Sequence, residues 1–254
     1  MSLMSVRRLT GIALAMLSLP AVAATPAATV VALVGTVSAQ LPNGSVEILA
    51  NGATLPEQGT ITTQENSYVR LRFSDGSTVT LRPQTVFRVS SYHFDKSAPK
   101  KSGMVASLIQ GGMRVIDGLI GHENPAGYKV HAGVATIGVL GTQYGLLLCH
   151  GVSYAPGVSG SPDHSAKNKE DRHQICPAKG LYLKVYQGKI AVSNQAGMDY
   201  FTAGEYGKVG SSMDRPILLT GNPDINYALP AAMDTSKTLL NLNDQPSTGA
   251  CLAH

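Results

Sequence analysis

Tryptophan is absent from this 254-residue sequence, and charged residues make up only 14% of it. Glycine and proline are plentiful by comparison, at 27 and 14 residues. This combination favours an all-β protein with many tight turns over a helical one. After the N-terminal stretch, no apolar run approaches the roughly 20 residues that a membrane-spanning helix needs, so we expect no integral membrane segment in the mature protein.

Motifs of catalysis and nucleotide binding are also missing. Gly133, Gly138, Gly141 and Gly145 have neither GxGxxG nor phosphate-loop spacing and are more typical of strand bends or bulges. The sequence has no GxSxG nucleophile elbow, and its carboxylates, such as Asp75, are scattered over predicted loops and not paired on neighbouring strands. We therefore expect a protein that is not an enzyme and that holds no cofactor.

The first 23 residues have the features of a secretory signal. Arg7 and Arg8 precede an apolar stretch at 12–19, which is followed by the small-residue pattern Ala-Val-Ala at 21–23. This order predicts a signal peptide over 1–23 and a mature protein that is periplasmic or exported. Removing both arginines lowers the formal net charge from +4 to +2, so the basic pI does not indicate a nucleic-acid partner.

The clearest alternation of apolar and polar residues lies between Thr60 and Tyr92 and predicts a β-hairpin. Directly opposed residues share a face, so Leu71 must lie opposite Val79. A three-residue turn, Ser74-Asp75-Gly76, with the glycine in the left-handed conformation, gives this register, whereas a two-residue turn does not. The hairpin then has a polar outer face made of Arg70, Arg72, Thr78, Thr80 and Arg82.

Three other glycine-containing dipeptides are predicted as two-residue hairpin turns: Asn43-Gly44, Gln110-Gly111 and Gln187-Gly188. In each case the parity of the flanking apolar residues fits such a turn. The pairs that these turns would place opposite each other are Ala39 with Ile48, Ala106 with Val115, and Val185 with Ile190.

The composition shifts at DKSAPKKSG, after Tyr92, which indicates a connection between two halves. We expect two similar antiparallel β units, a twin all-β sandwich or roll, over 24–100 and 101–214. The second unit contains a polar inserted loop at 150–175, and residues 215–254 are predicted as an irregular, extended tail. A weak internal repeat agrees with this division. VGTVSAQ followed by LANGATL resembles YQGKIAV followed by FTAGEYG, with the paired glycines 17 and 16 positions apart.

Two cysteines, Cys149 and Cys176, lie on either side of the polar loop, each next to a predicted strand. In an exported protein they predict a disulfide, which would contribute about 3 kcal/mol by restricting the unfolded chain. Cys251 in the tail is left over. A metal site is the alternative, because the HxxC spacing of His173 and Cys176, together with Cys149, suits zinc or copper.

Several segments resemble, in this order, the FecR-type periplasmic domain: VGTV, LANGATLPEQGTITT, RLRFSDGSTVTLRPQTVF, LIQGGMRVIDGLIG and VATIGVLGTQYGL. GLYLKVYQGKIAVSN with AGEYG resembles the final hairpin of that family. The similarity covers most of Val30 to Val209, and DGSTVTLRP and ATIGVLGT are its most specific parts. The sequence departs from the family at His131-Ala132, where members typically have Thr-Pro, and at Leu140, where they have a basic residue.

The resemblance implies a twin all-β module outside the cytoplasm. In regulators, this module passes a signal from an outer-membrane iron-siderophore receptor to a membrane-bound anti-sigma protein. Here we expect a cleavable signal in place of the cytoplasmic sigma-binding domain and no membrane helix after it, so we expect the resemblance to carry over the module and not the whole circuit. We expect the protein to act in protein–protein contact or signal sensing in the bacterial cell envelope.

The outer face of the central hairpin is the predicted interaction face. Arg70, Arg72 and Arg82 suit a carboxylate or a glycan, and Tyr68, Tyr92 and Tyr144 offer flat contact surfaces. An envelope protein is the expected partner, and an envelope polysaccharide such as peptidoglycan is the alternative. An ordinary solvated sheet face, without any partner, is the third interpretation of the same residues.

Overall fold

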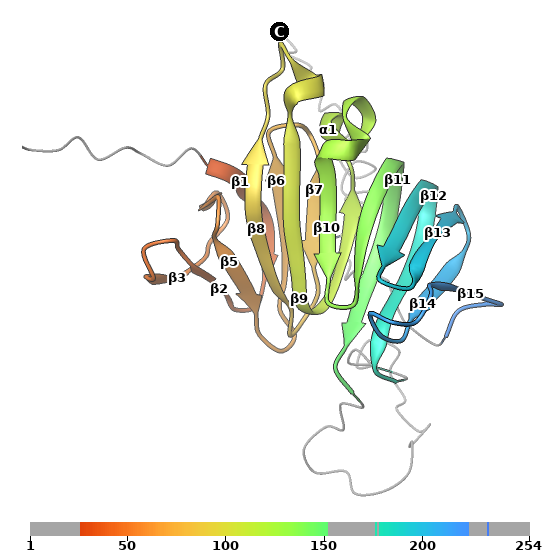
Figure 1. Ribbon diagram of the computed structural model, residues 1–254. Helices are drawn as coiled ribbons and strands as arrows, with labels where there is room; N and C mark the ends of the chain where they lie inside the picture. Colours follow the sequence, from red (N-terminus) through yellow and green to blue (C-terminus); the bar gives the residue numbers. More distant parts are fainter. Residues whose placement is uncertain (1–25, 152–175, 177, 224–232, 234–254) are drawn as a thin grey trace, which may run out of the picture.

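The computed structural model describes residues 26–151, 176, 178–223 and 233. The predicted signal peptide and most of the polar loop and tail lie outside these residues. Most of the described chain is β-strand, which confirms the all-β class (Figure 1). The strands are β1 Pro26–Val34, β2 Val37–Gln40, β3 Val46–Ile48, β4 Thr54–Pro56, β5 Thr60–Thr63, β6 Tyr68–Phe73, β7 Thr78–Leu81, β8 Val86–His93, β9 Gly103–Ile116, β10 Tyr128–Ala132, β11 Ala135–Cys149, β12 Gly180–Asn194, β13 Gly197–Thr202, β14 Tyr206–Val209 and β15 Ile217–Leu219.

Helical structure is limited to the short α-helix α1 (Leu119–Glu123) and two single turns of 3₁₀-helix, η1 (Pro99–Lys101) and η2 (Pro125–Gly127). None of the helices in the described part is long and apolar enough to cross a membrane.

The strands form one hydrogen-bonded network that folds over into two layers (Figure 1). Layer I has the order β3-β2-β5-β8-β9-β10-β11-β12-β13, and layer II has the order β4-β1-β6-β7-β9-β11-β12-β14-β15. Strands β9, β11 and β12 occur in both layers because each contributes one half to each. One pair, β9 with β10, is parallel, so the sheet is mixed and not purely antiparallel as predicted.

A left-handed glycine lies at the middle of each of these three long strands: Gly111, Gly141 and Gly188, with φ of 82°, 72° and 77°. At each glycine the strand leaves one layer and continues in the other. Gly35, with φ of 76°, lies in the same way between β1 and β2. We call these four positions the corner glycines. An L-residue adopts this backbone conformation only at a cost, which explains the use of glycine.

The corners show that two predicted hairpin turns, Gln110-Gly111 and Gln187-Gly188, are wrong. Ala106 pairs with Val89 and Val130, not with Val115. Val185 pairs with Tyr144, not with Ile190. The alternation of apolar residues indicates which face of a strand is buried. The same alternation fits a hairpin and a strand that bends into a second layer, so it does not distinguish between them.

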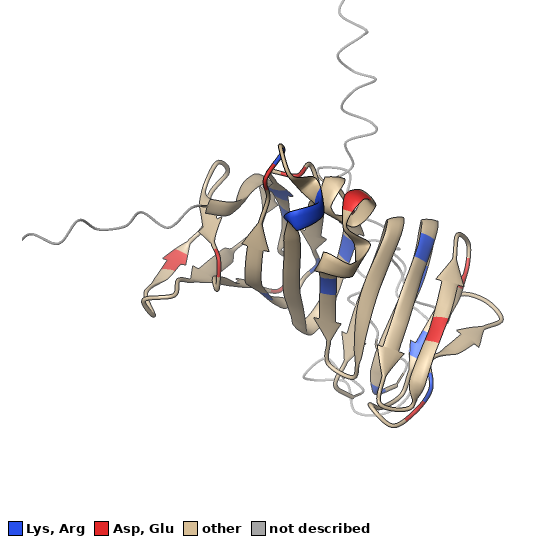
Figure 2. Ribbon diagram, turned by 45° about the horizontal axis from the view of Figure 1, so that its top comes forward, with Lys and Arg blue, Asp and Glu red and all other residues tan. Residues whose placement is uncertain are grey.

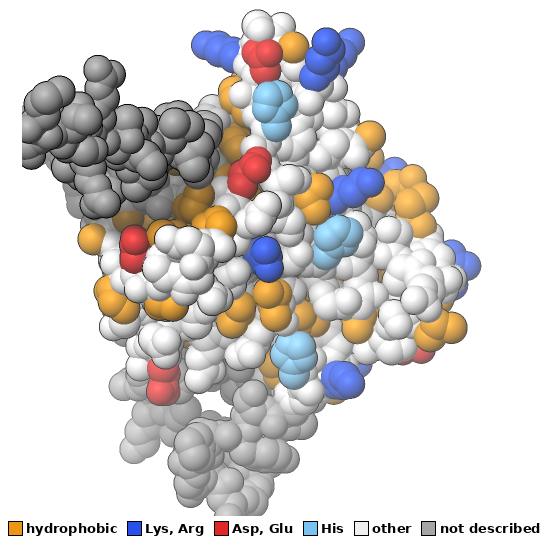
Figure 3. All heavy atoms as spheres, turned by 60° about the vertical axis from the view of Figure 1, so that its left-hand side comes forward, with side chains coloured by type: hydrophobic (Ala, Val, Ile, Leu, Met, Phe, Trp, Pro, Cys, Tyr) orange, Lys and Arg blue, Asp and Glu red, His pale blue; other side chains and the backbone are white. Residues whose placement is uncertain are grey.

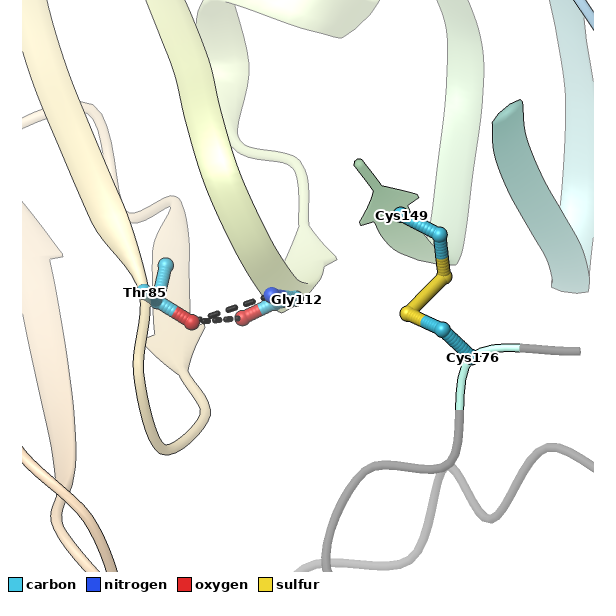
Figure 4. The surroundings of a disulfide bond; sticks show 4 residues. All are labelled: Thr85, Gly112, Cys149 and Cys176. Atoms are coloured by element: carbon cyan, nitrogen blue, oxygen red, sulfur yellow. Dashed lines mark hydrogen bonds between the residues drawn. A yellow bond between two sulfur atoms is a disulfide. The ribbon is translucent and has the colours of Figure 1, made fainter. Parts of the chain in front are cut away.

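At three corners a side chain satisfies the backbone group that the bend frees. In each case the backbone N–H of the residue after the corner glycine donates to a side-chain oxygen. The N–H of Thr36 donates to the Ser67 hydroxyl at 2.9 Å, that of Gly112 to the Thr85 hydroxyl at 3.0 Å, and that of Thr142 to the Asp117 carboxylate at 2.8 Å. The Thr85 hydroxyl also donates to the carbonyl of Gly112 at 3.0 Å (Figure 4). Buried backbone groups need such partners wherever the ladder is interrupted.

The central hairpin has the predicted register, with Val69 opposite Leu81 and Leu71 opposite Val79. Its loop is the predicted three-residue turn, in which the N–H of Gly76 donates to the carbonyl of Phe73 and Gly76 has φ of 88°.

The prediction for Asn43-Gly44 is wrong by one residue. Ser38, and not Ala39, lies opposite Ile48, so the turn has three residues. Its first residue is Pro42, whose fixed φ suits the first central position of a type I turn. Val46 and Ile48 of this short strand consequently face outward, with 65% and 71% of their surface exposed.

One hydrophobic core fills the space between the two layers. The glycines of the sequence repeat occupy equivalent places around it. Gly35 joins β1 to β2 and Gly52 joins β3 to β4, and β1 pairs with β4 while β2 pairs with β3. In the same way, Gly188 joins the two halves of β12 and Gly204 joins β13 to β14, and the two halves of β12 pair with β14 and β13. These two groups of strands lie at opposite ends of the layers (Figure 1). The division into units near residue 100 stays a prediction.

Candidate interaction face

Side chains on the outer surface of layer II are basic or neutral. Alternation along each strand places the apolar partners of these residues in the core and leaves the intervening positions outside. None of the outward positions on the described strands of this layer is acidic. We call this surface the basic face, even though charged residues are sparse along the ribbon as a whole (Figure 2). Its cations are Arg70, Arg72, Arg82, Arg114, Lys184 and Lys208.

Three of these cations lie in one row across the sheet. Arg70 pairs with Thr80, Thr80 with Arg114, Arg114 with Gly145 and Gly145 with Lys184. A small neutral residue therefore separates each cation from the next. Because strands lie about 4.8 Å apart, the row repeats a positive charge about every 10 Å at the backbone. This spacing avoids directly opposed like charges, which destabilise a sheet.

Tyrosine rings lie between the cations at the β12 end of the face. The guanidinium of Arg114 lies 4.2 Å from the ring centre of Tyr186, and the ammonium of Lys184 lies 4.7 Å from the same ring. Lys184 is also 5.0 Å from the ring centre of Tyr206. These are cation–π distances, which orient the basic groups while leaving them charged. Burial raises the pKa of the Tyr186 hydroxyl, and the charges of Arg114 and Arg82 oppose that rise.

The prediction of Tyr92 and Tyr144 as contact surfaces is wrong, because both side chains are buried in the core. The other four predicted interaction residues lie on one face but differ in accessibility. Tyr68 and Arg70 are half-buried and Arg72 is exposed, all on β6. Arg82, which follows β7, is only 5% exposed. A Cβ at Gly112 would lie 3.0 Å from the Cδ of Arg82, so the arginine stem packs where that glycine has no side chain. Arg82 therefore offers the smallest contact surface of the four.

Sequence reasoning missed Arg114, Lys184 and Tyr186 as members of this face. Their outward parity is visible in GMRVI and YLKVYQ. Their position beside Arg70 could not be predicted from the sequence, because it depends on β9 and β12 passing from one layer to the other at their corner glycines. A hairpin at Gln110-Gly111 would have placed Arg114 on another part of the sheet.

The predicted cysteine pair forms a disulfide at the edge of the same face (Figure 4). Cys149 and Cys176 are bonded, with 5.6 Å between their Cα atoms. They pack against Leu147 and Tyr182 in a small second hydrophobic cluster. Both sulfurs are used in the bond, so the alternative metal site has no thiolate ligand, and its third candidate, His173, lies outside the described residues. Among the described residues no group of three His, Cys, Asp or Glu side chains could hold a metal ion.

Asp75, the carboxylate of the DGST motif, is 3% exposed and has a structural position. Its Oδ1 accepts hydrogen bonds from the backbone N–H and hydroxyl of Ser77 at 3.1 and 2.7 Å. Its backbone carbonyl accepts from the N–H of Leu119 at 3.0 Å, which ties the hairpin loop to the start of α1. The backbone N–H of Asp75 donates to the hydroxyl of Tyr92 at 2.9 Å.

The outer surface of layer I is different in composition. Arg88 and Lys129 share it with Asp199 and with exposed apolar residues such as Ile109 and Leu140. The space-filling view toward β1 to β5 shows hydrophobic side chains dispersed among polar and charged ones (Figure 3). Layer I therefore lacks the single sign of charge that distinguishes the basic face.

The family model described as FecR protein matches residues 59–154, which confirms the resemblance seen in the sequence. Two crystal structures of a "putative anti-sigma factor" from Parabacteroides distasonis, at 1.65 and 2.50 Å resolution, match part of the chain. Each is 14% identical, with a TM-score of 0.41 over 64% of this chain and 60% of that chain. This chain thus spans less than two thirds of their length. No curated protein matches the sequence significantly.

Proposed function

Since residues 59–154 match the FecR family, we propose that this protein is an exported, non-enzymatic FecR-type module for protein contact or signal sensing in the bacterial cell envelope. The basic face is its contact surface. The observation that carries this proposal is the row of Arg70, Arg114 and Lys184, repeated on alternate strands without a carboxylate on the outward positions around it.

The chemistry of the face indicates an acidic protein partner. Arg72 is exposed, and arginine binds carboxylates through two parallel hydrogen bonds. The cations of the row are held in place by the sheet and by tyrosine rings, so less side-chain entropy is lost on binding. Complementary charge also accelerates encounter between partners.

Crosslinking in intact cells, followed by identification of the captured protein, tests the proposal. Arg72→Glu and Lys184→Glu should each reduce capture about tenfold or more, because each replaces an attraction with a like-charge contact. Arg88→Glu makes the same charge change on the exposed outer side of β8 in layer I and should leave capture unchanged. Equal loss in all three variants, or no loss in any, would contradict the assignment to layer II.

An envelope polysaccharide is the second candidate ligand. Tyr186 and Tyr206 are only half-buried and lie beside Lys184, an arrangement that suits an anionic glycan. Sedimentation of the purified protein with peptidoglycan separates the two candidates. Retention in the pellet that Lys184→Glu abolishes supports the glycan, whereas a soluble protein that is captured by an acidic partner supports protein contact.

A further inference from the structure

The outward side chains at the centre of the basic face are buried, although no third layer of the described strands lies over them. Thr80 and Arg82 are 3% and 5% exposed, and Leu147 and Tyr182 are 0% and 2% exposed. The alternation along their strands places these four side chains away from the core between the layers. Described neighbours account for part of this burial, since Leu147 and Tyr182 pack with the Cys149–Cys176 bond and Arg70 donates to the Thr80 hydroxyl.

Within residues 224–254 the structure describes Met233, and this residue lies on the basic face. Its side chain is 0% exposed. Its backbone carbonyl accepts a hydrogen bond from a terminal guanidinium nitrogen of Arg70, while the Nε of the same guanidinium donates to the Thr80 hydroxyl at 3.2 Å. Arg70 is thus held between its own sheet and a residue 163 positions later in the sequence.

Chain length is compatible with this contact. β15 ends at Leu219 on one edge of layer II, and β6 lies six strand spacings away. Six spacings of about 4.8 Å amount to about 29 Å, and 14 residues can extend over more than 40 Å. Met233 can therefore reach Arg70 without any displacement of β15.

We infer that Met233 is an intramolecular ligand of the basic face, docked beside Arg70. It presents a buried apolar side chain together with a backbone carbonyl that accepts a hydrogen bond from Arg70. The hydrogen bond from a charged donor to that carbonyl and the burial of the methionine side chain both favour docking. The face thus accepts a peptide, and its first occupant is this chain itself.

One consequence rests on the proposed function. A partner that uses Arg70 has to displace Met233 and supply its own acceptor, such as a carboxylate or a backbone carbonyl. Met233 therefore competes with such a partner for Arg70, and a partner that binds Arg70 only weakly does not displace it. The test below measures the docking alone, so its result is independent of whether a partner is found.

Methionine oxidation of the full-length mature protein by hydrogen peroxide, followed by peptide mass spectrometry, tests the inference. Met213 is 68% exposed and Met233 is 0% exposed. Because oxidation depends on the access of peroxide to the sulfur, Met233 should oxidise at least about tenfold more slowly than Met213. Arg70→Ala should raise the oxidation rate of Met233 toward that of Met213. Arg72→Ala, on the same strand and face but exposed, is the matched control and should not.

Modification of arginines by phenylglyoxal gives a second measurement in the opposite direction. Met233→Asp should increase labelling of Arg70, while Met213→Asp should leave it unchanged. Equal oxidation rates for Met233 and Met213 in the folded wild-type protein would overturn the inference, as would labelling of Arg70 that is as fast as that of Arg72. If Arg70→Ala does not fold, the comparison within the wild-type protein still decides.

Discussion

Gly188 packs directly against the carbonyl of Gly141, so that a Cβ at position 188 would overlap with that oxygen. The two glycines are the corners of neighbouring strands β12 and β11, and both have a left-handed backbone. Their contact stacks one bend on the next and keeps the two layers in register. The passage of the long strands between layers therefore depends on positions that have no side chain.

Replacing Gly188 by alanine should destabilise the protein by about 3 kcal/mol or more, since it combines a strained backbone with a steric overlap. The matched control is Gly138→Ala, three residues before the neighbouring corner, where an added Cβ would have no atom within 4 Å. That change should be neutral or stabilise by up to about 1 kcal/mol. Urea unfolding of both variants measures the difference, and similar values for the two would contradict the role of the corner.

Loss of the Cys149–Cys176 bond should lower the free energy of unfolding by about 3–4 kcal/mol, because it closes a sequence separation of 27 residues. Cys149→Ser with Cys176→Ser is the variant, and denaturant unfolding is the measurement. Thiol titration of the denatured wild-type protein should find one free thiol before reduction and three after it. Restoration of stability by added zinc in the reduced protein would instead support a metal site.

Asp117 should contribute more to stability at acid pH than at neutral pH, whereas a carboxyl group whose pKa is lowered by folding contributes less. Burial raises the pKa of its carboxyl in the folded protein, opposed by the Thr142 N–H that it accepts at the Gly141 corner and by His122. The folded state therefore binds the proton more tightly than the unfolded state, so this group's contribution falls as pH rises through the folded pKa.

Asp117→Asn keeps an acceptor for Thr142 and removes the titration. The difference in unfolding free energy, wild type minus variant, should therefore increase as pH is lowered from about 7 to about 4. Thermal or urea unfolding across this range measures it. A difference that stays constant with pH, in variants that are both folded, would show that the carboxyl is not perturbed.

Tyr92 should contribute to stability up to alkaline pH and then lose that contribution. Burial raises the pKa of its hydroxyl from 10.0 to about 12, with the carboxylate of Asp75 also favouring the neutral form. The unfolded chain loses this proton first, so the stability is fully present below pH 10.0 and is lost between 10.0 and about 12. Ultraviolet titration of tyrosinate should lack one late-titrating group in Tyr92→Phe, and an unchanged titration curve would contradict the assignment.

Much of the local structure follows from the sequence alone. The alternation around Asp75-Gly76 determines the register of the central hairpin, since a shift by one residue would expose Val69 and Leu71 together. The position of Cys149 and Cys176 beside two strands indicated their pairing, and the FecR resemblance came from short motifs such as DGSTVTLRP. The basic outer face of the hairpin was visible in the same alternation.

Only the tertiary structure decided which strands meet. Gly111 and Gly188 look like hairpin turns in sequence, yet the halves they join lie in different layers, because local parity reports burial and not the identity of the partner strand. For that reason the row from Arg70 through Arg114 to Lys184, and the contact of Arg70 with Met233, could not be read beforehand. The sequence determined the faces of the strands, and long-range packing determined which of those faces became one surface.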